Sequence, residues 1–299
     1  MAAKRQTTGF GAMKINRLTR KSNVAGLFKG LLFFVFLAAV LAGFAFLDRF
    51  VKKQNAPSPA NQTIELAGDI PAWVSEEIKN RVLAAATAEA PELEDNTAVT
   101  IQRNVVRLVP WITDVKVQAT HNGIQISGRW RKPIALVTAG KEKFFLDTDL
   151  IVLDYIPVPD LSVVTVAGLQ FDKHPPATGN TWQGEDLAAA LAVLSRLERM
   201  DSAVSPDKPL LRLIDTIDVS NFNGRQKKQD PHIVLYTKED IEIIWGAEIG
   251  AWQRHLESPD DDKLAKLYTF YQQNPTLTGV KYINLRDPRQ TIFLPIDKY

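Results

Sequence analysis

An uncharged run of eighteen residues, Gly30 to Leu47, limits what this chain can fold into more than any other feature of the sequence. As a helix, the run would extend about 27 Å, close to the roughly 30 Å hydrocarbon core of a bilayer. We therefore expect a transmembrane helix over residues 30–50. A cleaved signal peptide is the alternative, but its apolar region is normally about 7 to 15 residues long and ends at an A-x-A pattern, which is not clear here.

The residues before this run predict its orientation. Residues 1–29 carry seven Lys and Arg side chains and no Asp or Glu. An excess of basic residues on one flank keeps that flank in the cytoplasm. We expect a basic cytoplasmic tail over residues 1–29, a polar linker over 51–61, and an extracytoplasmic domain beyond it. The whole chain has a net charge of +2, so residues 30–299 sum to −5, and the basic pI near 8.6 does not indicate a nucleic-acid surface.

Residue types and spacing argue against an enzyme. The chain has no cysteine, which excludes disulfides, thiol catalysis and cysteine-bound metal. It also lacks the G-x-S-x-G, phosphate-loop and H-E-x-x-H patterns. The Asp147 and Asp149 pair is explained by a turn, and a basic loop around Arg225 by solvation. We expect no catalytic residue, metal, cofactor, small-molecule substrate or nucleic acid, and single, unclustered histidines at His121, His174, His232 and His255.

Residues 62–131 predict a small α+β domain. A helix should begin after Ser75, a typical N-cap residue followed by two acids. Two alternating segments flank Asn122-Gly123, a dipeptide that favours a type I′ hairpin turn. One face of the resulting sheet should be covered by the helices. The expected elements are a strand at Thr63–Ala67, the helix after Ser75, a helix near Thr97–Leu108, and hairpin strands at Ile112–Thr120 and Ile124–Trp130.

Residues 132–299 predict a larger β-rich domain with flanking helices. Its short apolar runs are separated by turn residues. One helix is expected near Glu185–Met200, and another should begin at Ser258, with Ser258 as its N-cap. The expected strands are Ile134–Thr138, Phe144–Leu146, Ile151–Leu153, Ser162–Val166, Leu211–Val219, His232–Lys238, Ile241–Trp245, Val280–Leu285 and Thr291–Ile296.

The last predicted strand, Thr291–Ile296, is the best candidate for a binding site. It is apolar on both faces, and a strand of this kind at a sheet edge exposes N–H and C=O groups to a partner strand. Pro295 has no N–H, so such pairing must stop or skip there. The alternative is a strand buried between the sheet and a helix.

Several motifs resemble the bacterial cell-division family FtsQ, also called DivIB. They are PWITDVKV at residues 110–117, RKPIA at 131–135, FLD at 145–147 and GVKYINLR at 279–286. The resemblance covers nearly the whole chain. It implies that the small domain is a polypeptide-transport-associated (POTRA) domain, and that the protein is a non-enzymatic scaffold of the divisome.

The resemblance also implies a location and partners. The protein would be a single-pass component of the bacterial cytoplasmic membrane at the division septum, with its C-terminal domain in the periplasm. It would bind FtsB/FtsL-like membrane division proteins and act on septal peptidoglycan synthesis. Partner binding would fall on Thr291, Ile292, Phe293 and Leu294, with Arg286 and Tyr282 nearby. The rival hypotheses are a membrane-anchored POTRA-type transport or assembly factor and an envelope enzyme.

Overall fold

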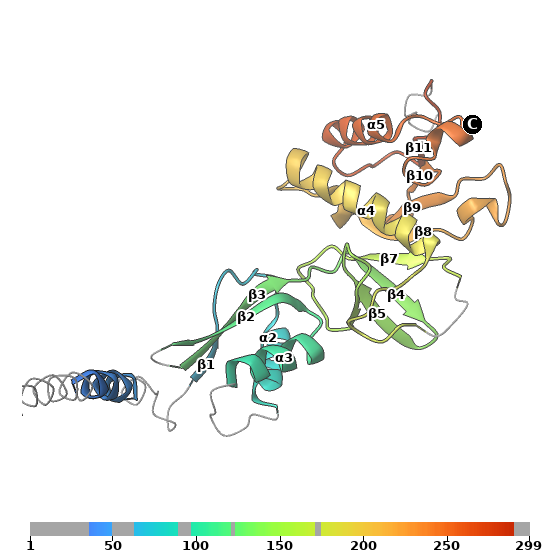
Figure 1. The fold of residues 1–299 in the computed structure, drawn as a ribbon. Helices are drawn as coiled ribbons and strands as arrows, with labels where there is room; N and C mark the ends of the chain where they lie inside the picture. Colours follow the sequence, from blue (N-terminus) through green and yellow to red (C-terminus); the bar gives the residue numbers. More distant parts are fainter. Residues whose placement is uncertain (1–35, 50–62, 89–96, 121–122, 171–174, 290–299) are drawn as a thin grey trace, which may run out of the picture. The chain divides into compact units, whose positions relative to one another are not determined.

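The computed structural model describes residues 36–49, 63–88, 97–120, 123–170 and 175–289. The chain divides into one unit up to Ala60 and a second from Asn61 onward. In the first unit, residues 36–49 form a helix (Figure 1). Its apolar residues are exposed, including Phe36, Phe44 and Phe46. Within these described ranges, no helix is both long and apolar enough to cross a membrane. The predicted span begins at Gly30, outside the described residues.

The second unit begins with a small α+β domain, as predicted. Its three-stranded sheet has the order β1-β3-β2. Strand β1 is parallel to β3, whereas β2 and β3 form the antiparallel hairpin. Figure 1 shows the two helices side by side on one face of this sheet. The elements are β1 (Thr63–Leu66), α2 (Glu76–Thr87), α3 (Thr97–Leu108), β2 (Ile112–Thr120) and β3 (Gly123–Trp130).

Both helices form for reasons visible in the sequence. The Ser75 hydroxyl accepts the backbone N–H of Ile78 at 3.4 Å, which confirms it as the N-cap of α2. Helix α3 contains several β-branched residues, but it buries Ile101 and Val105 against the sheet. The side-chain amide of Asn104 donates to the Ala88 carbonyl at 2.6 Å and ties the two helices together. Tertiary burial therefore outweighs the weak helix propensity of α3.

The predicted role of Gly123 in a two-residue turn was wrong. Gly123 pairs with Thr120 and is the first residue of β3, so Asn122-Gly123 is not the turn. Its φ of 154° and its neighbours explain the glycine instead, because a Cβ at this position would lie 2.1 Å from the Thr63 carbonyl oxygen. The glycine thus allows β1 to approach β3. Residues 121–122 lie outside the described residues.

The larger domain is built on an eight-stranded mixed sheet of order β11-β10-β9-β8-β7-β4-β5-β6. The β10–β11, β7–β8 and β4–β7 pairs are parallel, and the other pairs are antiparallel. The strands are β4 (Ala135–Ala139), β5 (Glu142–Leu146), β6 (Val152–Asp154), β7 (Val164–Ala167), β8 (Ile214–Asp218), β9 (Ile233–Thr237), β10 (Glu242–Gly246) and β11 (Tyr282–Asn284).

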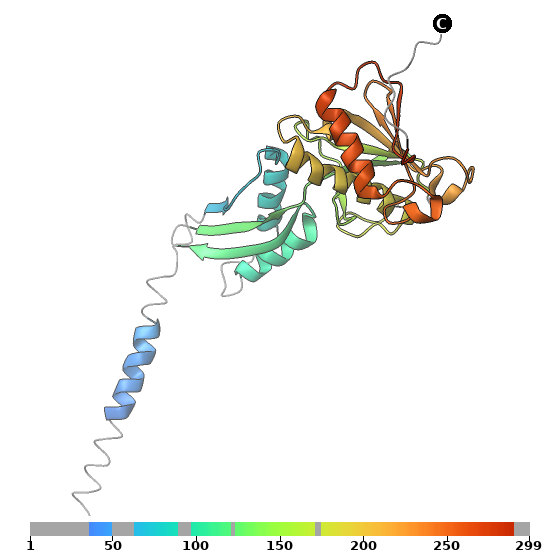
Figure 2. The same ribbon diagram turned by 90° about the horizontal axis from the view of Figure 1, so that it is seen from above.

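Two helices cover this sheet. Helices α4 (Glu185–Val204) and α5 (Asp260–Gln273) contact each other, as Figure 2 shows, and both contribute to one core with the strands. The remaining helical turns are η2 (Leu210–Arg212), η3 (Phe222–Gly224) and η4 (Trp252–His255). The predicted strand Leu211–Val219 therefore begins later than expected, after the turn η2. The final predicted strand, Thr291–Ile296, lies outside the described residues.

The predicted boundary at residues 131/132 separates the two sheets but not the two hydrophobic cores. Trp111, fully buried in the small domain, packs edge-on against Phe145 of β5 with ring centroids 6.1 Å apart. Its indole N–H donates to the Asp154 carboxylate of β6 at 2.8 Å. Arg81 of α2 pairs with the same carboxylate. Strands β5 and β6 thus complete the core of the small domain.

Two local predictions fail because tertiary contacts occupy the side chains concerned. Pro259, not Ser258, is the N-cap residue of α5, and the Ser258 hydroxyl instead donates to the Arg286 carbonyl at 3.2 Å. Arg225 was predicted to be solvated, and this prediction was wrong. Its guanidinium pairs with Asp186 at 3.1 Å and donates to the Gly168 carbonyl at 2.7 Å. Ser258 therefore bonds to a distant segment and does not cap α5, and Arg225 bonds to distant segments and is not solvated.

The Asp147 and Asp149 pair forms a turn, as expected. The Asp147 carboxylate accepts the backbone N–H groups of Asp149 and Ile151 at 3.0 and 2.8 Å. It also pairs with Arg131 at 2.6 Å, next to the boundary between the domains. Asp147 therefore has a structural role in holding the turn before β6.

Candidate partner-binding edge

Strand β11 lies at one edge of the eight-stranded sheet. The Lys281 carbonyl accepts the N–H of Glu242, and the N–H of Leu285 donates to the Ile244 carbonyl, at 3.3 and 3.0 Å. Consecutive residues of a strand point their backbone groups to opposite sides. The N–H and C=O groups of Tyr282 and Asn284 therefore point away from β10.

The outer side of β11 is partly covered. Lys266 of α5 extends its ammonium group to the Asn284 carbonyl at 3.4 Å and to the Asp287 carbonyl at 3.3 Å. Burial lowers the pKa of Lys266, and the charge of Asp287 partly offsets this effect. Within the described part of the chain, no strand pairs with the outer side of β11. The described edge thus offers the N–H and C=O groups of Tyr282 and Asn284, of which the Asn284 carbonyl is already contacted by Lys266.

The predicted partner-binding residues fall into two groups. The Tyr282 side chain is 50% exposed on the edge strand, and Arg286 follows that strand. Thr291, Ile292, Phe293 and Leu294 lie outside the described residues. The structure therefore shows where Tyr282 and Arg286 lie, and the partner-binding site as a whole stays a prediction.

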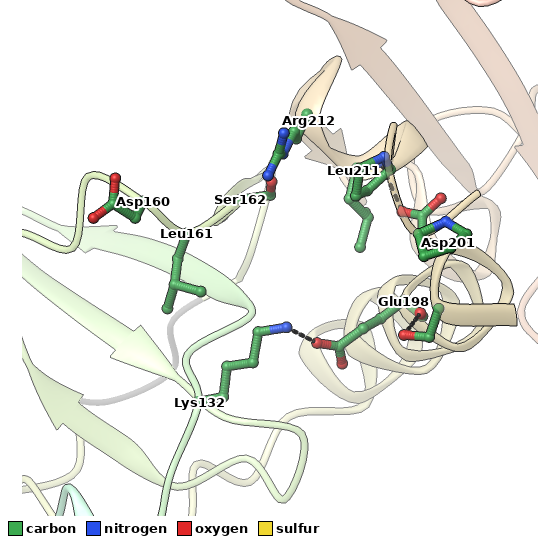
Figure 3. Close-up of a pocket in the computed structure, with 11 residues that line it drawn as sticks. Lys132, Asp160, Leu161, Ser162, Glu198, Asp201, Leu211 and Arg212 are labelled. Atoms are coloured by element: carbon green, nitrogen blue, oxygen red, sulfur yellow. Dashed lines mark hydrogen bonds and ion pairs between the residues drawn. The ribbon is translucent and has the colours of Figure 1, made fainter. Parts of the chain in front are cut away.

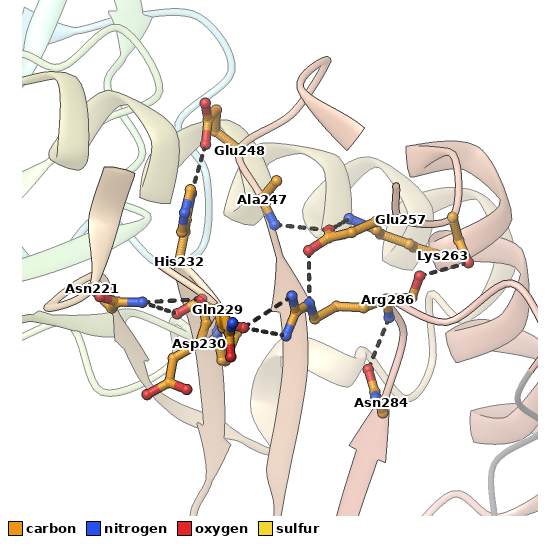
Figure 4. A network of polar contacts seen from close by, with 12 residues as sticks. Asn221, Gln229, Asp230, His232, Ala247, Glu248, Glu257, Lys263, Asn284 and Arg286 are labelled. Atoms are coloured by element: carbon orange, nitrogen blue, oxygen red, sulfur yellow. Dashed lines mark hydrogen bonds and ion pairs between the residues drawn. The ribbon is translucent and has the colours of Figure 1, made fainter. Parts of the chain in front are cut away.

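Arg286 is held inside a polar network that sequence reasoning did not find. Its Nε donates to Glu257 at 2.7 Å, and its terminal nitrogens reach the Gln229 carbonyl (Figure 4). Glu257 also accepts the ammonium of Lys263 at 2.7 Å and the backbone N–H of Ala247 at 2.9 Å. These contacts join the end of β10, the beginning of α5 and the end of β11. We call this network the Glu257 cluster, comprising Glu257, Lys263 and Arg286.

The Glu257 cluster depends on a buried charge pair. Lys263 is fully buried, with its ammonium 5.3 Å from the centroid of the Trp245 ring. Burial alone would raise the pKa of Glu257, but the bonds from Lys263, Ala247 and Arg286 outweigh it, and the pKa lies below its ordinary value. Gly246 leaves room for this carboxylate, because a Cβ there would lie 2.2 Å from a Glu257 oxygen. The cluster fixes where the chain leaves β11.

A second candidate feature is a cavity of about 350 Å³ on the larger domain (Figure 3). Lys132 and Glu198 bridge part of its wall at 2.5 Å. Asp201, also in the wall, is buried and accepts the N–H groups of Leu210 and Leu211 and the Tyr268 hydroxyl. These bonds to Asp201 hold the turn η2 and α5 in place. The charged groups named here therefore have structural partners, and they do not form a recognisable catalytic arrangement.

A third feature contradicts the prediction of isolated histidines. His232 and His255 stack edge-on with ring centroids 4.6 Å apart, and Glu248 lies 3.2 Å from His232 Nδ1. The three side chains come from separate segments, so no short sequence pattern could have found them. His121 and His174 lie outside the described residues.

With this geometry established, comparison with known proteins adds no assignment: no protein-family model matches the chain, and no curated protein matches it.

Proposed function

We propose that this protein is a non-enzymatic, membrane-anchored divisome scaffold of the FtsQ/DivIB type. Its extracytoplasmic domain would bind FtsB/FtsL-like partners by strand addition and so help to assemble and regulate septal peptidoglycan synthesis during cell division. The observation that carries the proposal is the position of β11 at the edge of the large sheet. The motif resemblance described above supplies the identity of the partners.

The chemistry of the edge supports strand addition. An added strand gains main-chain hydrogen bonds from outward N–H and C=O groups, and side-chain contacts give specificity. Tyr282 offers both an outward backbone and an exposed ring on β11. The apolar residues 291–294 follow within a few positions of Arg286, whose cluster holds the chain direction. A partner strand would add beside β11 or beside the predicted strand after it.

The helix over residues 36–49 supports a membrane anchor. Its side chains at Phe36, Leu41 and Phe44 are 69%, 62% and 70% exposed. A helix with apolar residues on all sides is unfavourable in water and favourable in lipid. The basic residues 1–29 would then stay on the cytoplasmic side, next to anionic lipid.

The first experiment tests the binding edge. Phe293→Lys places a charge in the apolar segment, and we expect at least a tenfold loss of co-purification with the FtsB-like partner from membranes. Val99→Lys is the matched control, because Val99 is an exposed apolar residue on α3 in the small domain. Membrane insertion and protein level should be unchanged in both variants. Equal co-purification of the wild type and Phe293→Lys would refute strand addition at this segment.

The second experiment tests the cellular role. A fluorescent fusion of the full chain should be enriched at midcell in dividing bacteria, as expected for a divisome component. A uniform distribution around the envelope would contradict the proposal and favour the POTRA-type transport or assembly factor. Loss of the midcell signal on deletion of residues 290–299, which leaves Arg286 and the Glu257 cluster intact, would support recruitment through this segment.

A further inference from the structure

Three side chains with metal-binding atoms meet at one end of the large sheet. His232, Glu248 and His255 each offer a ligand atom, and these atoms all lie within 4.8 Å of one another. The closest measured contact joins His232 Nδ1 to a Glu248 carboxylate oxygen at 3.2 Å, which is visible in Figure 4. We call these three residues the histidine cluster.

Two segments of the fold position the histidine cluster: the residue before β9 and the connection between β10 and α5. His232 immediately precedes β9, and Glu248 follows the last residue of β10, Gly246. His255 ends the short helix η4. Its neighbour Leu256 has a positive φ of 55°, which turns the chain back toward Glu257. Because two ligand positions lie in the connection between β10 and α5 and the third lies directly before β9, an ion bound here would fasten that connection to the start of β9.

The burial of the three residues suits a metal site. His232 is buried, whereas Glu248 and His255 are only half-buried. The Nε2 edge of His232 faces Gly224, where an added Cβ would lie 3.7 Å away, so Nδ1 remains directed toward Glu248. The cluster thus combines one fixed ligand with two that solvent ions can reach.

A carboxylate and two imidazoles bind a divalent ion when the carboxylate is ionised and both imidazoles are neutral.

The donor set selects one class of ion. Two imidazole nitrogens and one carboxylate oxygen suit zinc and similar divalent transition ions, whereas magnesium and calcium prefer oxygen ligands. Zinc bonds of about 2.0–2.1 Å require ligand atoms roughly 3.4 Å apart in a tetrahedron. His232 and Glu248 already meet this spacing. The ligand atom of His255 lies within 4.8 Å of both, so the His255 side chain would have to move closer to them when the ion binds.

We propose that His232, Glu248 and His255 bind one divalent ion of the zinc class, with a fourth position open to water. The ion would cross-link β9 to the segment between β10 and α5. This inference does not depend on the proposed divisome function, because the histidine cluster contains none of the predicted partner-binding residues and needs no partner.

The experiment uses the full chain purified in a mild detergent with an affinity tag that contains no histidine. The absence of cysteine removes the commonest competing ligands. After treatment with EDTA, titration calorimetry with ZnCl₂ should show one zinc ion per chain. Glu248→Gln and His255→Gln keep side-chain size, and each should weaken zinc binding at least tenfold. Because both positions are half-buried, these variants avoid emptying the core at His232.

The matched control is His121→Gln combined with His174→Gln, which removes the two histidines outside the cluster. We expect this variant to bind zinc as the wild type does. A loss of binding in this control, or equal binding by the wild type and Glu248→Gln, would overturn the proposal. So would zinc binding too weak to register in the wild type, since the contact would then be only a hydrogen-bonded histidine and carboxylate.

A second measurement keeps the test valid if a variant is poorly folded. Far-ultraviolet circular dichroism without metal should superimpose for all forms. CoCl₂ should give visible absorption bands typical of a nitrogen and oxygen site in the wild type and in the histidine control. Zinc should raise the unfolding temperature of these two forms, and at the same zinc concentration it should raise that of Glu248→Gln less. A wild-type unfolding temperature that does not respond to zinc would contradict the cross-link.

Discussion

A large side chain is completely buried near each edge of the large sheet, but the polar group of that side chain is paired by different chemistry at the two edges. Near β6, Trp111 packs against Phe145 and needs a single polar partner, Asp154. Near β11, Lys263 is equally buried and depends on the ionised Glu257. We call the first region the tryptophan junction. The Glu257 cluster defines the second.

This difference decides how each region responds to change. The tryptophan junction gains most of its stability from apolar area, which does not depend on protonation. The Glu257 cluster contains charges whose desolvation is costly, so removing one partner leaves another charge buried without compensation. The junction holds the two domains together mainly by apolar packing. The cluster holds the edge strand in a manner sensitive to a single proton.

The largest expected effect is that of Trp111→Ala at the tryptophan junction. Removing a fully buried indole leaves a cavity, and we expect a loss of about 4–5 kcal/mol in the free energy of unfolding. Urea unfolding of the full chain, followed by circular dichroism, measures this loss. Val106→Ala is the control, since Val106 is 57% exposed on α3 and should change stability little. A loss below about 1 kcal/mol would contradict the proposed difference between the two regions, because the tryptophan junction would then not depend on packing.

The next effect is that of Glu257→Gln in the Glu257 cluster. The amide cannot neutralise the buried Lys263, and we expect a loss of about 3 kcal/mol at pH 7. Because the folded-state pKa of Glu257 is depressed, its stabilising contribution is fully present above the ordinary value of 4.5 and is lost as the pH falls through the lower folded-state pKa.

The pH dependence provides the control for this prediction. The difference in stability between the wild type and Glu257→Gln should shrink steadily below about pH 4.5, whereas the difference between the wild type and Trp111→Ala should stay nearly constant. Urea titrations at several pH values measure both differences. Parallel pH profiles for the two variants would show that the regions do not differ in the way proposed.

A smaller effect is expected from Gly123→Ala in the small domain. The added Cβ meets the Thr63 backbone, so β1 must move away from β3, and we expect a loss of about 2 kcal/mol. Gly140→Ala is the control. Gly140 also has a positive φ, of 64°, but no described atom lies within 4 Å of its added Cβ. Backbone strain alone should therefore cost this variant about 1 kcal/mol in the free energy of unfolding. Faster amide exchange in β1 of the first variant alone would locate the effect. Equal losses in both variants would assign it to backbone strain.

The smallest effect is that of Lys79→Ala on the surface of α2. The Lys79–Glu76 pair is close, at 2.8 Å, but the Glu76 side chain is 80% exposed. We expect a change of less than about 0.5 kcal/mol, by the same urea titration. This variant compares an exposed ion pair, Lys79–Glu76, with the buried pair Lys263–Glu257. A loss similar to that of Glu257→Gln would mean that burial is not the deciding factor.

Local patterns in the sequence were sufficient to predict most of the helices and strands. The Ser75 cap and the alternating hairpin segments act over a few residues, and they fix α2, β2 and β3 with nearly the predicted bounds. The α+β class follows from the order of these elements. The parallel pairings of β1 with β3 and of β10 with β11 could not be predicted, because they join segments far apart in the chain.

The sites were less predictable than the elements. The family resemblance named Tyr282 and Arg286 as residues near the predicted binding strand, but the bonds of Arg286 depend on Glu257 and Gln229, which reach it from other segments. The histidine cluster was missed for the same reason. His232 and His255 carry no mutual spacing signal, and only the pairing of β9 with β10 brings them together.

The parallel pairing of β1 with β3 has a consequence for synthesis of the protein. Thr63 pairs with Gly123 and Leu66 pairs with Ile126, so β1 cannot complete its hydrogen bonds until the ribosome has added residues 67–126. At roughly 5–20 residues per second, this takes several seconds. During that interval β1 is an open strand on a nascent chain, and Gly123 is the residue whose arrival allows it to begin to close. The speed of translation through this stretch therefore sets how long a chaperone has to protect the strand.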